Sequence, residues 1–166
     1  MTPPSARLLL VALLLTGGCS RNDSGTVTAF GGGRSDEDQA APERPNPCRL
    51  FTAKDIGLVT TLDVGEGKRI ETNGCRWPAK SGKGRAIVRE MSVADARDYP
   101  RPPGATSLPE VGRDGFVAKS AWGWRAGTTV GGTFAYVELS GDGVDDTTAA
   151  ELLKETTERI AAVPRG

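Results

Sequence analysis

The chain of 166 residues contains no histidine. Histidine is the general base of Ser-His-Asp and Cys-His catalytic groups, a common ligand of zinc and copper, and the usual proton carrier near pH 7. Its absence excludes these kinds of site. The protein could still be an enzyme that uses a carboxylate pair or a Ser-Lys pair, but the sequence carries no recognisable catalytic or metal-binding motif. We therefore expect a protein that is not an enzyme and has no metal or cofactor.

An excess of positive charge is also lacking, because 21 Lys and Arg residues face 21 Asp and Glu residues. Loss of residues 1–18 would remove one base, Arg7, and give a net charge of −1. Nucleic-acid-binding proteins and polybasic membrane patches show the opposite composition. We expect no nucleic-acid partner.

Long apolar runs are absent as well, since the run Leu8–Leu15 is far shorter than the ~20 residues of a membrane-spanning helix. The run follows Arg7 and leads into the small residues Thr16 to Gly18. This order is typical of a secretory signal peptide. We predict that residues 1–18 are a leader that is removed after export.

Cys19 ends this leader in the segment LLLTGGC. The segment resembles a bacterial lipobox, with Thr16 in the usual leucine position. The resemblance implies that Cys19 receives a diacylglycerol and holds the protein, by two or more acyl chains, on the outer face of the cytoplasmic membrane. The alternative is an ordinary signal peptide cut nearby, which would leave Cys19 as a free thiol.

Residues 20–46 are rich in Gly, Ser, Pro and acidic residues, with one aromatic side chain, Phe30. Such a composition cannot bury enough apolar surface to fold, so it predicts a disordered linker. A flexible chain of 27 residues has an r.m.s. reach of about 30 Å. Residues 47–166 then suffice for a single globular domain.

Within this domain the pattern predicts strands and few helices. Thr52 to Asp55 resembles a capping box for a helix over 53–59, and Ser92 to Asp95 resembles another, for two turns ended by Tyr99-Pro100. Apolar residues recur with helical spacing from Ala149 to Ile160, after Asp145 and before Pro164. β-Rich runs predict strands in 59–64, 69–77 and 84–91, and two or three antiparallel strands over 116–127 and 128–141. We expect an α+β fold, an antiparallel sheet with helices on one face and an amphipathic helix at the C-terminus.

With Cys19 acylated, Cys48 and Cys75 are an even pair in an exported protein, where disulfides persist. A redox-active pair more often has the spacing Cys-x-x-Cys, and two thiols are too few for a structural zinc site. We predict a structural disulfide, with Trp77 packed against it.

The segments Pro47-Cys48-Arg49-Leu50-Phe51-Thr52 and Cys75-Arg76-Trp77 resemble those of actinobacterial lipoproteins in the domain of unknown function 3558 family. Members of that family have a lipobox, a polar linker, a Pro-Cys motif before a short helix and a Cys-x-Trp motif on a strand. This chain differs at Phe51, where a leucine is usual, and at Val111 to Asp114, where the family has a glycine-rich turn. The resemblance implies an envelope lipoprotein and, since that family has no settled activity, supplies no catalytic residue.

Four residues are candidates for ligand binding: Trp122, Trp124, Arg125 and Tyr136. The two tryptophans lie two positions apart, which predicts one face of a strand and an aromatic platform for a sugar or an apolar ligand. The alternative is that they fill the core between the sheet and the last helix. The acidic run Gly141 to Asp146 lacks the spacing of a calcium-binding EF-hand, and acidic residues before a helix are expected from its dipole.

These observations favour a lipid-anchored, non-catalytic module that binds a small molecule or an envelope protein. Two other hypotheses stay open. One is a histidine-free hydrolase that acts on cell-wall material with a carboxylate pair, which predicts one carboxyl with a raised pKa in a pocket. The other is an accessory subunit of an envelope complex, which predicts a broad apolar surface.

Overall fold

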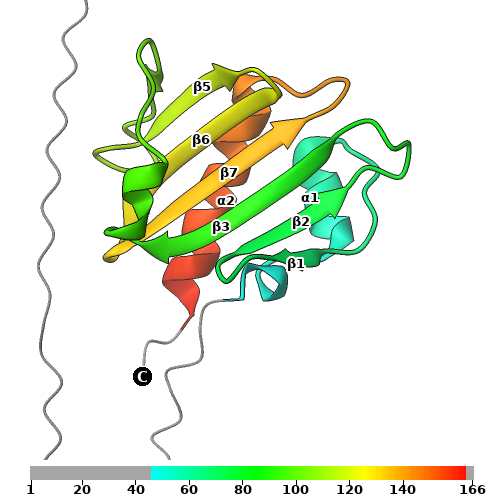
Figure 1. Cartoon of the computed structure of the whole chain (residues 1–166), viewed down its shortest axis with the longest axis horizontal. Helices are drawn as coiled ribbons and strands as arrows, with labels where there is room; N and C mark the ends of the chain where they lie inside the picture. Colours follow the sequence, from blue (N-terminus) through cyan, green and yellow to red (C-terminus); the bar gives the residue numbers. More distant parts are fainter. Residues whose placement is uncertain (1–45, 164–166) are drawn as a thin grey trace, which may run out of the picture. The chain divides into compact units, whose positions relative to one another are not determined.

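A computed structural model describes residues 46–163 as a sheet with two α-helices packed on one of its faces (Figure 1). The elements are, in chain order, the 3₁₀ helix η1 (Pro47–Arg49), α1 (Ala53–Thr60), β1 (Lys68–Ile70), β2 (Gly74–Pro78), β3 (Arg85–Ser92), the 3₁₀ helix η2 (Asp95–Asp98), β4 (Thr106–Ser107), β5 (Phe116–Ser120), β6 (Gly123–Val130), β7 (Thr133–Ser140) and α2 (Asp146–Ala162). The expected α+β fold is confirmed. The predicted leader, Cys19 and nearly all of the predicted linker lie outside the described residues.

The sheet has seven strands in the order β1-β2-β3-β7-β6-β5-β4, and all neighbours are antiparallel. Two meanders, β1 to β3 and β4 to β7, join through the pair β3–β7. The chain must therefore run from β3 in the middle of the sheet to β4 at the far edge. It does so across the face that the helices leave open (Figure 1).

The helix α2 begins and packs as its sequence predicts. Asp145 caps it by accepting a hydrogen bond from the Thr148 backbone N–H (2.8 Å). Its periodic residues are all buried: Ala149, Leu152, Leu153, Thr156 and Ile160. They pack on β5, β6 and β7, and together with residues of α1, β2 and β3 they form the main hydrophobic core.

The segment before β1 is fixed by a capping box and by the disulfide. Thr52 and Asp55 bond reciprocally at the start of α1, as expected. The predicted disulfide between Cys48 and Cys75 is confirmed, and it links η1 to β2 with 5.1 Å between the Cα atoms. Beside it, Trp77 is buried and meets the Phe51 ring edge to face, with 6.2 Å between ring centroids.

Three expected elements differ from the structure. The strand expected over 59–64 is wrong because Val59 and Thr60 complete α1, where the buried Thr60 hydroxyl donates to the Ile56 carbonyl (2.7 Å). The run 69–77 is a hairpin rather than one strand, since Glu71 turns the chain with a φ of 52°. The helix after Ser92 is only a single 3₁₀ turn, since the Tyr99 N–H bonds back to Ala96 and Pro100 has no N–H to continue it.

Removal of the disulfide should lower the free energy of unfolding. The bond closes a loop of 27 residues, and the chain-entropy model assigns such a loop about 3.5 kcal/mol. We expect the double variant Cys48→Ser/Cys75→Ser to lose about that amount in urea unfolding. Oxidised wild-type protein is the reference and reduced wild-type protein should match the variant. Equal unfolding midpoints for all three would contradict the prediction.

Candidate functional site

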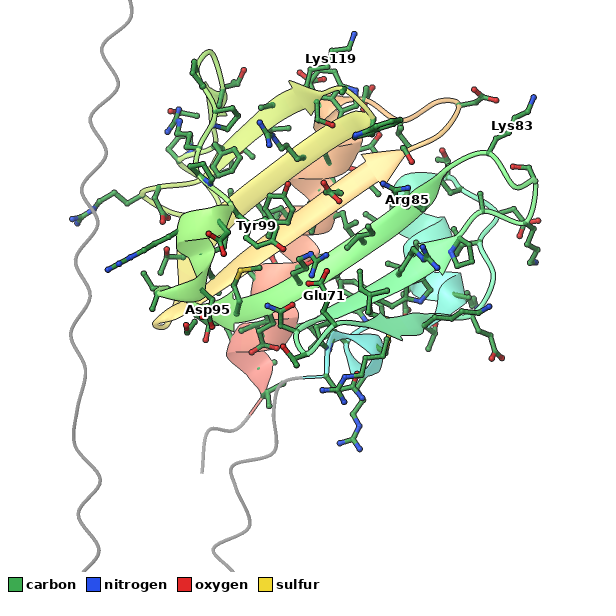
Figure 2. The ribbon with its side chains drawn as sticks, viewed as in Figure 1. Glu71, Lys83, Arg85, Asp95, Tyr99 and Lys119 are labelled. Atoms are coloured by element: carbon green, nitrogen blue, oxygen red, sulfur yellow. A yellow bond between two sulfur atoms is a disulfide. The ribbon has the colours of Figure 1, made fainter. Side chains whose placement is uncertain are left out.

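The side of the sheet away from the helices carries most of the polar chemistry of the domain. Side chains alternate along each strand, so Ala86 and Val88 of β3 face the helices while Ile87 and Arg89 face the other way. We call this second side the open face (Figure 2). It is divided into a covered half and an uncovered half.

The covered half lies under residues 93–105, here called the strap. Apolar residues of the sheet and of the strap form a second, smaller core: Met91, Phe116, Phe134 and Tyr136 from the sheet, with Ala96, Tyr99 and Ala105 from the strap. The Tyr99 ring packs on that of Tyr136 with 4.8 Å between centroids. Burial raises the pKa of Tyr99, and burial with the nearby Glu138 carboxylate raises the pKa of Tyr136 to about 12. Both hydroxyls are therefore neutral at physiological pH.

Arg89 is a buried cation at the edge of the strap. It lies opposite Tyr136 in the β3–β7 pair and is 7% exposed. Its Nη1 donates to Glu71 Oε2 (2.6 Å) and Asn73 Oδ1 (3.2 Å), and its guanidinium lies 5.4 Å from the Tyr99 ring centroid. Glu71 and Tyr99, both labelled in Figure 2, thus contact the same guanidinium. This ties the β1–β2 turn to the strap.

The uncovered half is basic. One row across the sheet, read from the strand registers, runs Lys68, Arg76, Ile87, Glu138, Arg125. Arg85 lies two residues before Ile87 on the same side of β3. Within the described part of the chain, none of the four bases Lys68, Arg76, Arg85 and Arg125 is in an ion pair. The Nε atom of Arg125 is buried and has no hydrogen-bond partner, a property it shares with the Nε of Arg89.

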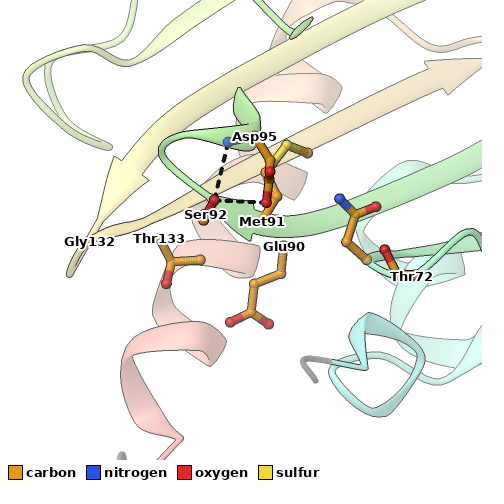
Figure 3. Close-up of a pocket in the computed structure, with 8 residues that line it drawn as sticks. Thr72, Glu90, Met91, Ser92, Asp95, Gly132 and Thr133 are labelled. Carbon is orange, nitrogen blue, oxygen red and sulfur yellow. Dashed lines mark hydrogen bonds between the residues drawn. The ribbon is translucent and has the colours of Figure 1, made fainter. Parts of the chain in front are cut away.

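Two cavities flank the strap. The larger, of about 530 Å³, lies where β3 ends and β7 begins, and its lining includes Thr72, Asn73, Glu90, Met91 and Asp95 (Figure 3). The smaller, of about 300 Å³, lies between the strap and β5 to β7. Its lining includes several apolar side chains: Val93, Ala96, Tyr99, Phe116 and Phe134. Both volumes lie in the range of small-molecule sites.

The four candidate residues do not form one platform. Trp122 lies in the β5–β6 turn and is 78% exposed, whereas Trp124 is half-buried on the helix side of β6 and packs on the main core. Arg125 and Tyr136 lie on the open face. The alternation of side chains along a strand already places Trp124 and Arg125 on opposite faces.

Sequence reasoning missed Arg76, Arg89 and Tyr99, and it assigned Arg85 to a basic hairpin tip with Lys80 and Lys83 rather than to the open face. Arg85 and Arg89 are four residues apart in the strand run GRAIVREM, a spacing that places both on one face. This spacing could have shown, from the sequence, that Arg85 and Arg89 share a face of the sheet. Nothing in the local pattern places Arg76 or Tyr99 beside them, because β2 and the strap reach β3 only through tertiary pairing.

The pKa is lowered for Asp55, Asp114 and Asp145, and each of these carboxyls has a structural role. Hydrogen bonds from Thr52 lower the pKa of Asp55, and those from Thr148 lower the pKa of Asp145. Asp95, which lines the larger cavity, accepts from the Ser92 hydroxyl (2.7 Å) at the start of η2 (Figure 3). Across residues 46–163, no cluster of three cysteine or acidic side chains is suited to hold a metal ion.

Asp114 ties the turn before β5 to β6. Its carboxylate accepts hydrogen bonds from Thr128 Oγ1 (3.0 Å), the Thr129 backbone N–H (2.9 Å) and Thr129 Oγ1 (2.5 Å). Burial alone would raise the pKa of Asp114, but these bonds lower it below the usual value. A carboxyl with a lowered pKa stabilises the fold above its unfolded pKa of about 3.9, and this contribution is lost as the pH falls through the folded pKa.

We therefore predict that Asp114→Asn, which keeps the shape of the side chain, lowers the free energy of unfolding near pH 7. The difference from wild type should shrink steadily as the pH falls below about 4. Urea unfolding at a series of pH values measures it. The other carboxyls contribute equally to the free energy of unfolding of both proteins, so their contributions cancel in the difference. A difference that does not change with pH would refute this role of the charge.

Neither α-helix in the described part of the chain is long and apolar enough to cross a membrane. Comparison of the chain with protein-family models, with curated proteins and with solved structures finds no significant match. The resemblance to the 3558 lipoproteins stays a prediction.

Proposed function

We propose that the chain is a lipid-anchored protein of the bacterial cell envelope, of the 3558 kind, whose domain binds a small molecule beside the strap. The larger cavity carries this proposal. Its volume of about 530 Å³ suits a ligand of modest size. Hydroxyl, amide and carboxyl groups converge on it from the β1–β2 turn, from β3 and from the strap.

The lining of this cavity favours a polar ligand with several hydroxyl groups, such as a sugar. Thr72 and Asn73 offer donors and acceptors, and Ser92 and Asp95, whose hydroxyl and carboxylate are bonded to each other, offer acceptors. Met91 supplies an apolar contact at the base. The smaller cavity, with its aromatic lining, could take an apolar part of the same or another ligand.

Binding is favoured over catalysis for two reasons. The chain has no histidine. Asp95, on the wall of the larger cavity, is held by Ser92 through hydrogen bonds at the start of η2, which is a structural use of that carboxylate. An accessory subunit with a broad apolar surface is supported less well. The large apolar side chains that are exposed in the described chain lie on four different elements: Leu58, Val93, Trp122 and Val163.

The anchor follows from Cys19 and the segment before it. Two acyl chains hold a protein stably in a bilayer, whereas one holds it only marginally. A linker of 27 residues would then let the domain move within about 30 Å of the membrane. The disulfide fits the oxidising environment outside the cytoplasm.

Acylation is tested by growing cells with labelled palmitate. We expect label on the wild-type chain and its recovery with the membranes. Cys19→Ser should carry no label and should leave the membrane fraction almost completely, because its acyl acceptor is gone. Cys48→Ser/Cys75→Ser is the matched control and should keep the label. An unlabelled wild-type chain would refute the anchor.

Ligand binding is tested by native mass spectrometry of the full chain purified from its own membranes. We expect an added mass on the wild-type protein. Thr72→Trp should reduce its occupancy at least tenfold, because the indole would fill part of the larger cavity, while the hydrogen bond from Arg69 Nη2 is kept because it goes to the Thr72 backbone carbonyl. Thr106→Trp, at another exposed threonine away from the cavity, should leave the occupancy unchanged. A wild-type protein without added mass that also binds no sugar from a panel of mono- and disaccharides would contradict the proposal.

A further inference from the structure

We infer that the uncovered half of the open face, together with Trp122, rests on the anionic phospholipid headgroups of the membrane to which the chain is anchored. This inference rests on the proposed anchor and is independent of the ligand proposed for the cavity. In this role the four bases Lys68, Arg76, Arg85 and Arg125, here called the basic surface, fix the orientation of the domain relative to the membrane.

The first observation is the separation of charge within the domain. The chain without residues 1–18 has a net charge of −1, yet Lys68, Arg76, Arg85 and Arg125 lie together on one face with Glu138 as the acid of their row. None of these bases has an ion pair in the described chain. A face of this kind is attracted to a surface of negative potential, and each base near such a surface strengthens binding about fivefold.

The second observation is the spacing of the bases. Adjacent strands lie about 4.8 Å apart, so the row from Lys68 on β1 to Arg125 on β6 extends about 19 Å across five strands. The bases therefore face an extended surface rather than converge on one small anion. A layer of phosphate headgroups provides such a surface.

The third observation is the place of Arg125. It is half-buried on the open face, opposite Glu138 in the β6–β7 pair and beside the Tyr136 hydroxyl. Phosphate oxygens are good acceptors for the planar fork of a guanidinium. The part of this guanidinium that is open to solvent would meet a headgroup over this part of the sheet.

Trp122 gives an independent indication. Its side chain is 78% exposed, and among the large apolar side chains exposed in the described chain it is the aromatic one. It borders the same shallow pocket as Arg85 and Glu138, so the indole lies beside the basic surface. Tryptophan is enriched where proteins meet the headgroup region of a bilayer, because its ring is apolar and its N–H is polar.

The anchor makes the membrane the favoured occupant over an acidic protein or a soluble phosphate polymer. A domain held within about 30 Å of a bilayer meets that surface at high effective concentration, so a contact that is weak in solution becomes significant. The strap beside the basic surface carries two bases, Arg97 and Arg101, and two acids, Asp95 and Asp98, and adds no net repulsion.

The experiment measures how close Trp122 lies to the lipid. The full acylated chain is reconstituted into vesicles of phosphatidylcholine alone or of equal parts phosphatidylcholine and phosphatidylglycerol, with acyl chains brominated near the headgroup. Bromine quenches tryptophan fluorescence at short range. We expect quenching in the anionic vesicles that is absent with phosphatidylcholine alone and is lost in about 1 M salt, where the Debye length is about 3 Å.

Two paired variants separate the surface from the anchor. Arg76→Glu/Arg85→Glu removes two bases of the surface and should weaken the contact by roughly 25-fold or more. Lys54→Glu/Lys154→Glu makes the same charge change on α1 and α2, on the other side of the sheet. The Trp122 fluorescence of this variant should be quenched as strongly as that of wild type. Trp122→Phe should remove the part of the fluorescence that bromine quenches. This would show that the quenched emission comes from Trp122.

Each outcome decides the inference. Equal quenching in both kinds of vesicle, or an equal loss of quenching in the two charge variants, would overturn the inference. The anchor would stand if the chain still floats with the vesicles. Salt-sensitive binding to soluble polyphosphate without quenching by vesicles would assign the surface to a soluble anion instead. If the chain proves not to be acylated, the inference falls together with the anchor. If the chain is acylated and floats with both kinds of vesicle but its Trp122 is not quenched in the anionic ones, the inference alone is refuted.

Discussion

β3 and β7 pair along their whole length, from Arg85 opposite Ser140 to Ser92 opposite Thr133, although residues 93–132 separate them in the sequence. Because this pair lies in the middle of the sheet, the chain that leaves β3 must cross a face to reach the opposite edge. The helices cover one face, so the crossing takes place on the other. The strap, its small aromatic core and the two cavities beside it all follow from this constraint.

The crossing also divides the open face. Under the strap, Arg89 is neutralised by Glu71 and covered by the Tyr99 ring, so its charge serves the fold. Beyond the strap, the bases of the neighbouring strands have no such partners in the described chain. One polar sheet face thus carries a partly buried ion pair at one end and, at the other, bases that have no ion pair in the described chain. The proposed ligand and membrane contacts use different halves.

The first part of the domain is held by a second set of long-range contacts. The disulfide joins η1 to β2, and Arg159 of α2 donates to the Leu50 carbonyl (2.5 Å) while it lies over the Phe51 ring. These contacts fix α1 beside α2 on the same side of the sheet. The helix layer therefore leaves the other face to the strap.

Local patterns in the sequence were enough for some of these features. The period of buried residues and the cap at Asp145 determine α2, and the reciprocal bonds of Thr52 and Asp55 start α1. An even pair of cysteines, in a chain predicted to be exported, indicates the disulfide. Each depends on residues a few positions apart or on a simple count. The fold class followed in the same way. The strand expected at Val59 and Thr60 failed because helical bonding and burial outweighed the preference of β-branched side chains for strands.

The order of the strands and the site were decided by tertiary structure alone. Lys68, Arg76, Arg85 and Arg125 come from four strands, and a nearly neutral composition gives no sign that they share a face. Likewise, Tyr99 meets Tyr136 only because the strap crosses the sheet. Local sequence patterns determined α1, α2, their caps and the cysteine pair. Strand pairing, which joins residues far apart in the chain through backbone bonds that any residue except proline can make, decided which side chains act together.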